Sequence, residues 1–254
     1  MSIHPHVLIE GLSKRYGDGP SVLHGLDLEV SAGEFVSLIG PSGCGKSTIL
    51  KLIAGLNPVT AGRLLVRGQA PEVARDRMAF IFQEPTLLPW LTVIRNIEIL
   101  LRIRKVPRNR CLKIADGMLA LVRLNHVRNH YPRQLSGGMK MRVSIARALS
   151  LLPELLLLDE PFGALDEMTR DHLNEELLDL RKDQNWTALF VTHSVREAVF
   201  LSNRIVVLAA NPGRIHEVVE VPLTYPRTNE TRDSNAYLRV VSEVSHVLRS
   251  VEGQ

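Results

Sequence analysis

Cysteine and long apolar runs are both scarce in this sequence. Cys44 and Cys111 are the two cysteines among 254 residues, too few for a disulfide framework, so a reducing cytoplasm is expected. The longest apolar run, residues 149–158, is interrupted by Pro153 and Glu154 and is too short to cross a bilayer. The start, MSIHPHVLIE, has no basic stretch before a long apolar one, so no signal peptide is predicted. If the protein acts at a membrane, we expect another chain to cross it.

A strong charge of either sign is also missing. The net charge is +4, which suits an anionic partner such as nucleotide, phospholipid or nucleic acid without choosing among them. The chain is 45% hydrophobic and 23% charged, and it has no internal repeat. This composition is that of a globular protein, and the length of 254 residues predicts one large domain or a core with an inserted subdomain.

Short runs rich in Val, Ile, Leu and Phe predict strands that are buried on both faces of a parallel sheet, because they show little polar alternation. The runs are residues 35–39, 78–82, 155–158, 188–191 and 205–209. Helical patterns lie between several of them, so the predicted fold class is α/β.

Four of these runs lead into polar groups of different chemistry. In chain order these are a glycine-rich loop, Gln83, the pair Asp159 and Glu160, and His193 after Thr192. Polar residues often simply end strands, and one such ending would mean little. Because the carboxyl ends of parallel strands meet at one edge, where ligands bind, we expect all four groups at a single site.

The glycine-rich loop reads GPSGCGKST and matches G-x-x-x-x-G-K-[ST] in full. Its backbone N–H groups and the start of a helix near Lys46 are expected to cradle the phosphates of ATP. The predicted nucleotide-binding residues are Gly40, Pro41, Ser42, Gly43, Cys44, Gly45, Lys46, Ser47 and Thr48. Lys46 would reach the β and γ phosphates and Ser47 would bind Mg²⁺. The Cys44 thiol is expected to have no role of its own.

The polar strand endings suggest roles around a bound triphosphate. Asp159 occupies the place of a second Mg²⁺ ligand, and Glu160 that of a general base for the attacking water. Gln83 is a candidate for holding water or the metal, and His193 for bonding the γ-phosphate or the water. A histidine after a strand is often only structural, so the last two assignments depend on their neighbours.

A second glycine cradle lies at residues 135–139, LSGGM. Ser136 is a good helix N-cap, and Gly137 and Gly138 leave a bare helix N-terminus that favours anions. Taken alone, the same residues also describe an ordinary capped helix.

The loop, the LLLLDEP strand, the LSGGM cradle and the Thr192-His193 ending occur in the order of ABC ATPases, and the sequence resembles that family over nearly its whole length. The resemblance implies a P-loop NTPase (RecA-like) core with an N-terminal antiparallel β subdomain and an inserted helical subdomain. It also implies one ATPase domain, residues 1–254. Residues 1–91 and 152–234 would form the core, 92–151 the helical subdomain and 235–254 a C-terminal amphipathic helix.

The resemblance also implies roles in a head-to-tail homodimer with two ATP molecules between the subunits. Ser136, Gly137 and Gly138 would contact the γ-phosphate bound to the other subunit, and residues 164–166 would link the two sites. Tyr16 would stack on adenine. The sequence departs from the family pattern at three positions, where Met139 replaces Gln and Ser194 and Asn203 replace acidic residues.

The segments EPTLLPWLTVIRNI and AANPGRIHEVVEVPLTYPR resemble the nitrate, sulfonate and taurine importer branch. This resemblance implies a separate integral membrane permease, a periplasmic or extracellular solute-binding protein that acts indirectly, and a peripheral place on the cytoplasmic side of the inner membrane. No nucleic acid partner is expected, and the solute stays open. Residues 87–90 are candidates for permease contact; alternatively, Leu88 and Trp90 pack into their own domain.

Two further segments have alternative interpretations. Residues 102–113 hold six basic side chains and no acidic one, which indicates a solvated face or contact with anionic lipid headgroups. Residues 235–251 place apolar side chains on one helical stripe, which predicts docking on the same domain or, alternatively, on a partner.

Two rival functions remain, namely a soluble ABC ATPase that acts on DNA or ribosomes and a nucleotide-gated subunit with little hydrolysis.

Overall fold

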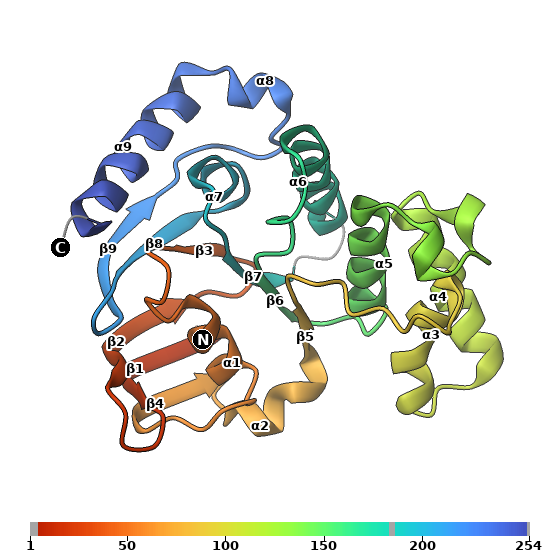
Figure 1. Cartoon of the computed structure of the whole chain (residues 1–254), viewed down its shortest axis with the longest axis horizontal. Helices are drawn as coiled ribbons and strands as arrows, with labels where there is room; N and C mark the ends of the chain where they lie inside the picture. The colour runs from red at the N-terminus through yellow and green to blue at the C-terminus, as the bar shows by residue number, and fades with distance from the viewer. Residues whose placement is uncertain (1–4, 183–185, 253–254) are drawn as a thin grey trace.

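The computed structural model describes residues 5–182 and 186–252, and their strands form two sheets (Figure 1). The smaller sheet is antiparallel in the order β2-β1-β4, and the larger runs β5-β6-β7-β3-β8-β9. The strands are β1 (Val7–Arg15), β2 (Ser21–Val30), β3 (Phe35–Ile39), β4 (Ala61–Val66), β5 (Met78–Ile81), β6 (Leu155–Asp159), β7 (Thr187–Val191), β8 (Arg204–Ala209) and β9 (Arg214–Glu220). In the larger sheet, β5, β6, β7, β3 and β8 are parallel, and β9 pairs antiparallel with β8 at the edge. The predicted α/β fold with an N-terminal antiparallel unit is confirmed.

Alternate residues of the large sheet enter two separate hydrophobic cores. Leu156 and Leu158 of β6 pack in the core that contains Phe190, whereas Leu155 and Leu157 pack in the other. All these side chains are fully buried. Burial on both faces is why the strand sequences lack polar alternation. Each of the five strand predictions is confirmed to within one residue at either end.

Helices connect the strands and cover both faces of the large sheet (Figure 1). They are α1 (Lys46–Ile53), α2 (Pro71–Ala74), α3 (Val93–Ile103), α4 (Arg108–Leu121), α5 (Gly137–Leu149), α6 (Glu167–Lys182), α7 (Val195–Leu201), α8 (Asn229–Arg232) and α9 (Asn235–Glu252). Helices α3, α4 and α5 pack on one another at one side of the molecule, which confirms the helical character predicted there. Within the described part of the chain, no helix combines the length and apolarity needed to cross a bilayer.

Helix α9 docks on the body of its own chain, which confirms the favoured expectation. The apolar stripe consists of Tyr237, Val240, Val244, Val247 and Val251, all buried, with Val241 and Leu248 packed beside them. The Tyr237 hydroxyl donates to the carbonyl of Arg196 in α7 at 3.0 Å, so the helix is anchored by a polar contact as well.

The strand register brings the carboxyl ends of the parallel strands level with one another. Val191 at the end of β7 pairs with Leu38 of β3 on one side and with Asp159 of β6 on the other. The residues that follow these strands therefore emerge at one rim of the sheet, as predicted from the sequence.

Candidate functional site

The loop of residues 40–48 lies between β3 and α1 and bends in ways that require glycine. Gly40 and Gly45 have φ angles of 153° and 95°. A Cβ atom would lie 2.5 Å from the Leu208 carbonyl oxygen in the first case and 2.4 Å from a Leu23 methyl carbon in the second, so a side chain is excluded at both positions. Among the described residues, no side chain caps the first turn of α1 and no acidic residue lies in it. Its free N–H groups suit an anion.

The Lys46 ammonium is held inside this loop. It donates to the carbonyl oxygens of Gly40 at 2.8 Å and Pro41 at 2.9 Å, and the residue is only 6% exposed. A buried positive charge therefore stands at the start of α1. Cys44 is fully buried, and burial raises the pKa of its thiol. The thiol stays protonated and unreactive, in line with the expectation that it has no role.

Ser47 and Asp159 meet beside the loop, where the sequence predicts a metal site. The Ser47 hydroxyl donates to Asp159 Oδ1 at 2.7 Å. Burial and the neighbouring charge of Glu160 raise the pKa of Asp159, although the Ser47 hydrogen bond opposes this. A bound cation would offset the cost of burying that carboxylate.

The donors of this pair fit Mg²⁺. Both atoms are hard oxygens, and Mg²⁺ in nucleotide sites is held by one or two carboxylates together with substrate phosphates. Within residues 5–182 and 186–252, no group of three or more His, Cys, Asp and Glu side chains could hold a metal ion by itself. The phosphates would therefore have to complete the coordination.

Glu160 adopts a backbone conformation that is unusual for a residue with a side chain. Its φ is 48°, a left-handed value that costs about 1–3 kcal/mol. Its N–H donates to the carbonyl of Val191 at 3.0 Å, and its own carbonyl accepts from Gly163. The carboxylate oxygen Oε1 lies 2.7 Å from His193 Nε2. The strain is thus retained where it directs a carboxylate toward the imidazole and the loop.

Gln83 reaches the same rim from the end of β5. A Cβ placed on Gly163 would lie 3.6 Å from both Gln83 Nε2 and Glu160 Oε2, so the amide and the carboxylate share one neighbourhood. The segment after Gln83 is tied to α5 by Arg147, whose guanidinium donates to the carbonyls of Pro85 and Thr86 at 3.0 Å each. Sequence reasoning did not identify Arg147.

A cavity of about 290 Å³ joins these groups. It is lined by Val22, Ser42, Gly43, Gly45, Lys46, Ser47, Thr48, Glu160 and His193. Most of the predicted phosphate-binding and catalytic residues therefore converge on one space. Val22 of β2 was not predicted, because nothing in a single apolar residue indicates that it will face a loop 20 residues away.

Tyr16 lies outside the lining of this cavity. It is 48% exposed, and its hydroxyl accepts a hydrogen bond from Asn57 Nδ2 at 3.0 Å. The Lys14 ammonium lies 4.6 Å from the centre of its ring. One ring face thus meets a cation, and stacking of Tyr16 on adenine stays a prediction.

The second glycine cradle is separate from the first within one chain. Ser136 caps α5 by accepting from the Met139 N–H at 3.3 Å. Cβ atoms on Gly137 and Gly138 would lie 3.2 Å from Leu165 and 3.0 Å from Thr169, so the cradle rests against the segment that begins α6. None of its residues lines the cavity beside the phosphate loop as far as the chain is described.

The loop before α3 is rigid on one side and exposed on the other. Asn96 is fully buried and holds the loop by accepting from the Leu88 N–H at 2.8 Å and donating to the carbonyls of Leu88 and Leu91. Trp90 is 70% exposed. The alternative that Trp90 packs into its own domain is therefore wrong, whereas Leu88 is half-buried.

Two of the departures from the family pattern have local structural roles. Ser194 caps α7 by accepting from the Glu197 N–H at 3.3 Å. The Thr192 hydroxyl bonds the Glu197 carboxylate, whose pKa is raised by burial. Asn203 accepts from the Phe35 N–H at 2.9 Å. These contacts fix the segment around His193 and the start of β3 without carboxylates at either position.

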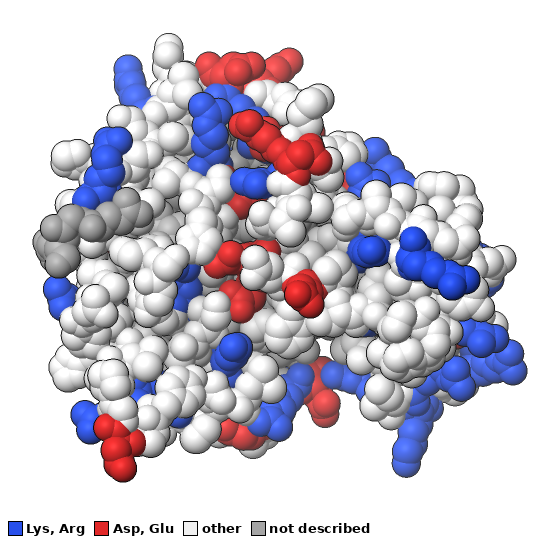
Figure 2. Space-filling model, in the orientation of Figure 1, with Lys and Arg blue, Asp and Glu red and all other residues white. Residues whose placement is uncertain are grey.

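The basic side chains of residues 102–113 are all exposed. They lie where α3 ends and α4 begins, and Figure 2 shows lysine and arginine gathered on that side of the molecule. Arg104 lies 3.6 Å from Asp76. This exposure agrees with both alternatives, a solvated face and contact with lipid headgroups.

Comparison with known proteins gives concordant matches. The family model described as ABC transporter matches residues 23–163. The chain is 47% identical to the aliphatic sulfonates import ATP-binding protein of Bacillus subtilis over 88% of this chain and 87% of that protein. It is 42% identical to a putative ATP-binding protein of Brucella abortus over 96% and 94%.

Solved structures agree with these relatives. A dimeric post-hydrolysis state of the ATP-binding cassette MJ0796, bound to ADP and Pi, has a TM-score of 0.75 at 31% identity. That match covers 86% of this chain and all of the other. The protein cbiO1 of Clostridium perfringens, part of the ABC transporter complex cbiONQ, has a TM-score of 0.79 at 23% identity over 97% and 99% of the two chains, and this match supports the fold alone.

Proposed function

We propose, from the premise that the chain belongs to the ABC transporter family of ATP-binding cassettes, that it drives an importer for aliphatic sulfonates or chemically related solutes such as taurine and nitrate. ATP binding and hydrolysis are the activity of this family. Relatives from three Bacillus species that are 45–48% identical are named as sulfonate import ATP-binding proteins. The observation that carries the ATPase assignment is the convergence of Lys46, Ser47, Glu160 and His193 on one cavity.

In the proposed mechanism, the phosphate loop binds the triphosphate through its N–H groups. Lys46 exchanges its contacts with the Gly40 and Pro41 carbonyls for the β and γ phosphates. Ser47 and Asp159 would hold Mg²⁺, which neutralises charge on the phosphate oxygens when bound. Adenine lies beyond the loop, where Tyr16 is the candidate for stacking on it.

Hydrolysis then depends on Glu160. Its carboxylate takes a proton from water as the water oxygen attacks the γ-phosphorus and the bond to ADP breaks. His193 orients that carboxylate at 2.7 Å and is available to the γ-phosphate. Gln83, next to Glu160, helps to hold the water or the metal.

The second cradle acts in trans in this proposal. Within the described residues, the lining of the phosphate-loop cavity does not include Ser136, Gly137 or Gly138 of the same chain. A second copy in head-to-tail orientation would bring them to the γ-phosphate, where the N-terminus of α5 adds favourable dipole charge. Residues 164–166, against which Gly137 packs, would carry the signal between the two sites.

The permease is proposed to dock at residues 87–90. Trp90 presents an exposed indole on a loop that Asn96 holds rigid, and an exposed aromatic on a fixed loop is suited to a protein interface. Arg147 ties the neighbouring segment to α5, so movement of the second cradle would reach the permease. The subunit would thus sit at the cytoplasmic side of the inner membrane, and a solute-binding protein would act from the other side.

Co-expression with a candidate permease of the sulfonate importer type tests the transport assignment. We expect an integral membrane protein to co-purify with the chain, and vesicles that contain the complex to accumulate labelled ethanesulfonate only with ATP. ATP hydrolysis that is stimulated by nucleic acid or ribosomes, without any membrane partner, would instead support the rival soluble ATPase.

A further inference from the structure

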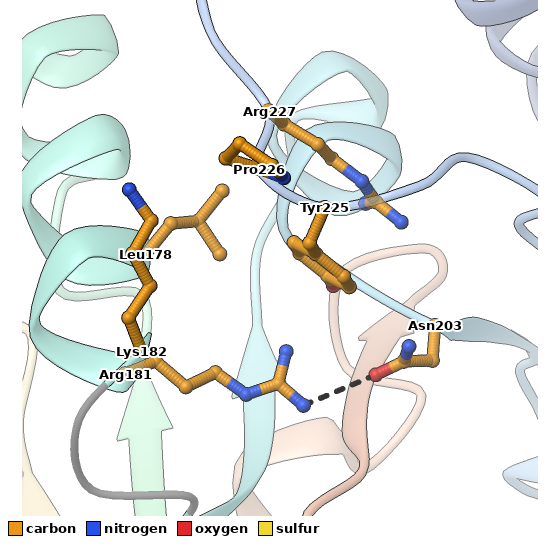
Figure 3. A pocket seen from close by; sticks show the side chains of 7 residues that line it. All are labelled: Leu178, Arg181, Lys182, Asn203, Tyr225, Pro226 and Arg227. Carbon is orange, nitrogen blue, oxygen red and sulfur yellow. Dashed lines mark hydrogen bonds between the residues drawn. The ribbon is translucent and has the colours of Figure 1, made fainter.

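A cavity of about 550 Å³ lies at the end of the sheet opposite the phosphate loop (Figure 3), and the proposed function does not use it. It is lined by Leu178, Arg181, Lys182, Asn203, Tyr225, Pro226 and Arg227. Asn203 directly precedes β8, and Arg181 bonds the carbonyl of Gly33 just before β3, which places the cavity at the amino ends of these strands. Its volume is that of a pocket for a small molecule.

The charged side chains that line the cavity are all positive. Arg181, Lys182 and Arg227 contribute to its wall, and no Asp or Glu does so in the described residues. Lys182 also pairs with Asp179 at 2.6 Å on the exposed face of α6. Neither arginine is in an ion pair within residues 5–182 and 186–252. The wall therefore carries positive charge that a bound anion would compensate.

Arg227 shows most clearly that positive charge in the wall lacks a carboxylate partner. It is only 4% exposed, and its terminal nitrogens donate to backbone carbonyls alone, among them those of Phe200 and Ser202 at 2.9 Å. Its Nε has no hydrogen-bond partner among the described residues. Burial and the nearby charge of Arg181 lower the pKa of Arg227. A guanidinium buried without a counter-charge is costly unless an anion approaches it.

Apart from the amide of Asn203, the rest of the wall is apolar or aromatic, and contacts hold it in place. The ring of Tyr225 lies 4.1 Å from the Arg227 guanidinium and 5.2 Å from that of Arg181, and its hydroxyl donates to the Leu201 carbonyl at 2.7 Å. In Figure 3, Leu178 of α6 faces Tyr225 and Pro226 across the cavity, and Arg181 extends toward Asn203. The site thus offers cationic groups beside an aromatic and aliphatic surface.

We infer that this cavity binds a small organic oxyanion, a sulfonate or carboxylate with a short apolar chain. The anionic head would lie among the three cationic side chains, and the chain against Leu178, Tyr225 and Pro226. An inorganic ion would leave the apolar part of the wall uncovered, and a neutral molecule would leave Arg181 and Arg227 without a counter-charge. The preference for a sulfonate rests on the proposed function, whereas the anion site itself does not.

An occupant of this cavity would contact Arg181, which packs against the strand that leads to the phosphate loop. The Arg181 guanidinium lies 5.5 Å from the centre of the Phe35 ring at the start of β3, and β3 ends at the loop. The ligand would therefore be held by residues that are packed against the nucleotide-binding core, yet outside its catalytic rim.

Isothermal titration calorimetry on the full chain tests this inference with four probes, namely pentanesulfonate, pentanoate, sodium sulfate and 1-pentanol. Because a sulfonate could also bind the phosphate loop, each titration is repeated with Lys46→Ala. We expect the two organic anions to bind wild type and Lys46→Ala alike, and sulfate and pentanol at least about tenfold more weakly, or about 1.4 kcal/mol.

Charge reversal identifies the site. Lys182→Glu is expected to weaken pentanesulfonate binding at least about tenfold, whereas Lys113→Glu, an exposed lysine of α4, leaves it unchanged. Absence of binding to wild type, loss of binding in Lys46→Ala, or equal affinities in Lys182→Glu and wild type would overturn the inference. ATP hydrolysis by the same preparations tests the proposed function separately.

Discussion

Glu160 Oε1 and His193 Nε2 lie 2.7 Å apart, although they are 33 positions apart in the chain with a whole helix and strand between them. The contact exists because β6 and β7 are parallel neighbours whose ends are in register. The imidazole therefore holds the carboxylate at the cavity beside Lys46, where we propose that a water loses its proton.

Replacement of His193 by Ala is expected to lower kcat for ATP hydrolysis at least about tenfold, roughly 1.4 kcal/mol, because Glu160 loses the group that orients it. ATP affinity should stay close to that of wild type. Steady-state phosphate release and nucleotide titration measure the two effects. His172→Ala is the matched control, since His172 pairs with Glu176 at 3.1 Å away from the cavity. Equal turnover in His193→Ala and wild type would remove His193 from the mechanism.

Asp159→Asn is expected to abolish the Mg²⁺ dependence of ATP binding and yet to stabilise the protein without nucleotide. Burial, with Glu160, raises the pKa of Asp159 in the folded state. The folded protein therefore holds this proton more tightly than the unfolded chain does, and the associated stability is lost as pH rises through the raised pKa. The free energy of unfolding of Asp159→Asn should therefore exceed that of wild type by an amount that grows from about pH 4 to neutral pH.

Asp166→Asn provides a control for that experiment, because the pKa of Asp166 is shifted in the opposite direction. Hydrogen bonds from Thr169 lower the pKa of Asp166, so its contribution to stability is present above the ordinary Asp pKa and is lost as pH falls. Thermal unfolding across the same pH range measures both variants. A stability difference for Asp159→Asn that shrinks as pH rises would contradict the account.

Trp90→Ala is expected to spare ATP hydrolysis by the free subunit and to reduce solute uptake by the complete transporter at least about tenfold, because an exposed aromatic anchor typically contributes 2 kcal/mol or more to an interface. Phosphate release and vesicle uptake measure the two activities. Met168→Ala, at another highly exposed apolar side chain, is the matched control. Equal loss of both activities in folded Trp90→Ala would remove the docking role.

Val244→Asn should destabilise the domain by about 2–4 kcal/mol, because a fully buried apolar contact is replaced by an unpaired amide. Ser242→Asn on the exposed face of α9 should have little effect. Truncation before Asn235 should also lower the melting temperature. Melting curves that match wild type for both Val244→Asn and the truncation would show that α9 is not part of the folded core.

The sequence predicted those parts of the structure that depend on local pattern. The strands were found because burial on both faces removes polar alternation, and the phosphate loop because its glycines and Lys46 are contiguous. Arg147 was missed because it bonds backbone carbonyls 61 and 62 residues away, which only tertiary packing brings to it. Asn96 was missed because the loop that it holds, although close in the chain, follows no recognisable motif.

The same limit applies to the remote cavity. Arg181 and Arg227 meet around Tyr225 from segments that are 46 residues apart, and no sequence motif joins them. The left-handed backbone of Glu160 was likewise not predictable, because it accompanies a hydrogen bond to Val191 on a strand that is distant in the chain.

The central claim is that Glu160 is the general base of an ATPase site formed by the phosphate loop. Steady-state phosphate release by Glu160→Gln compared with wild type, at saturating ATP and Mg²⁺, tests it most directly. A fall of about 10²–10⁴-fold, with ATP still bound and a dimer accumulating on gel filtration, is the predicted result. Turnover close to that of wild type in a variant that binds ATP would contradict the claim.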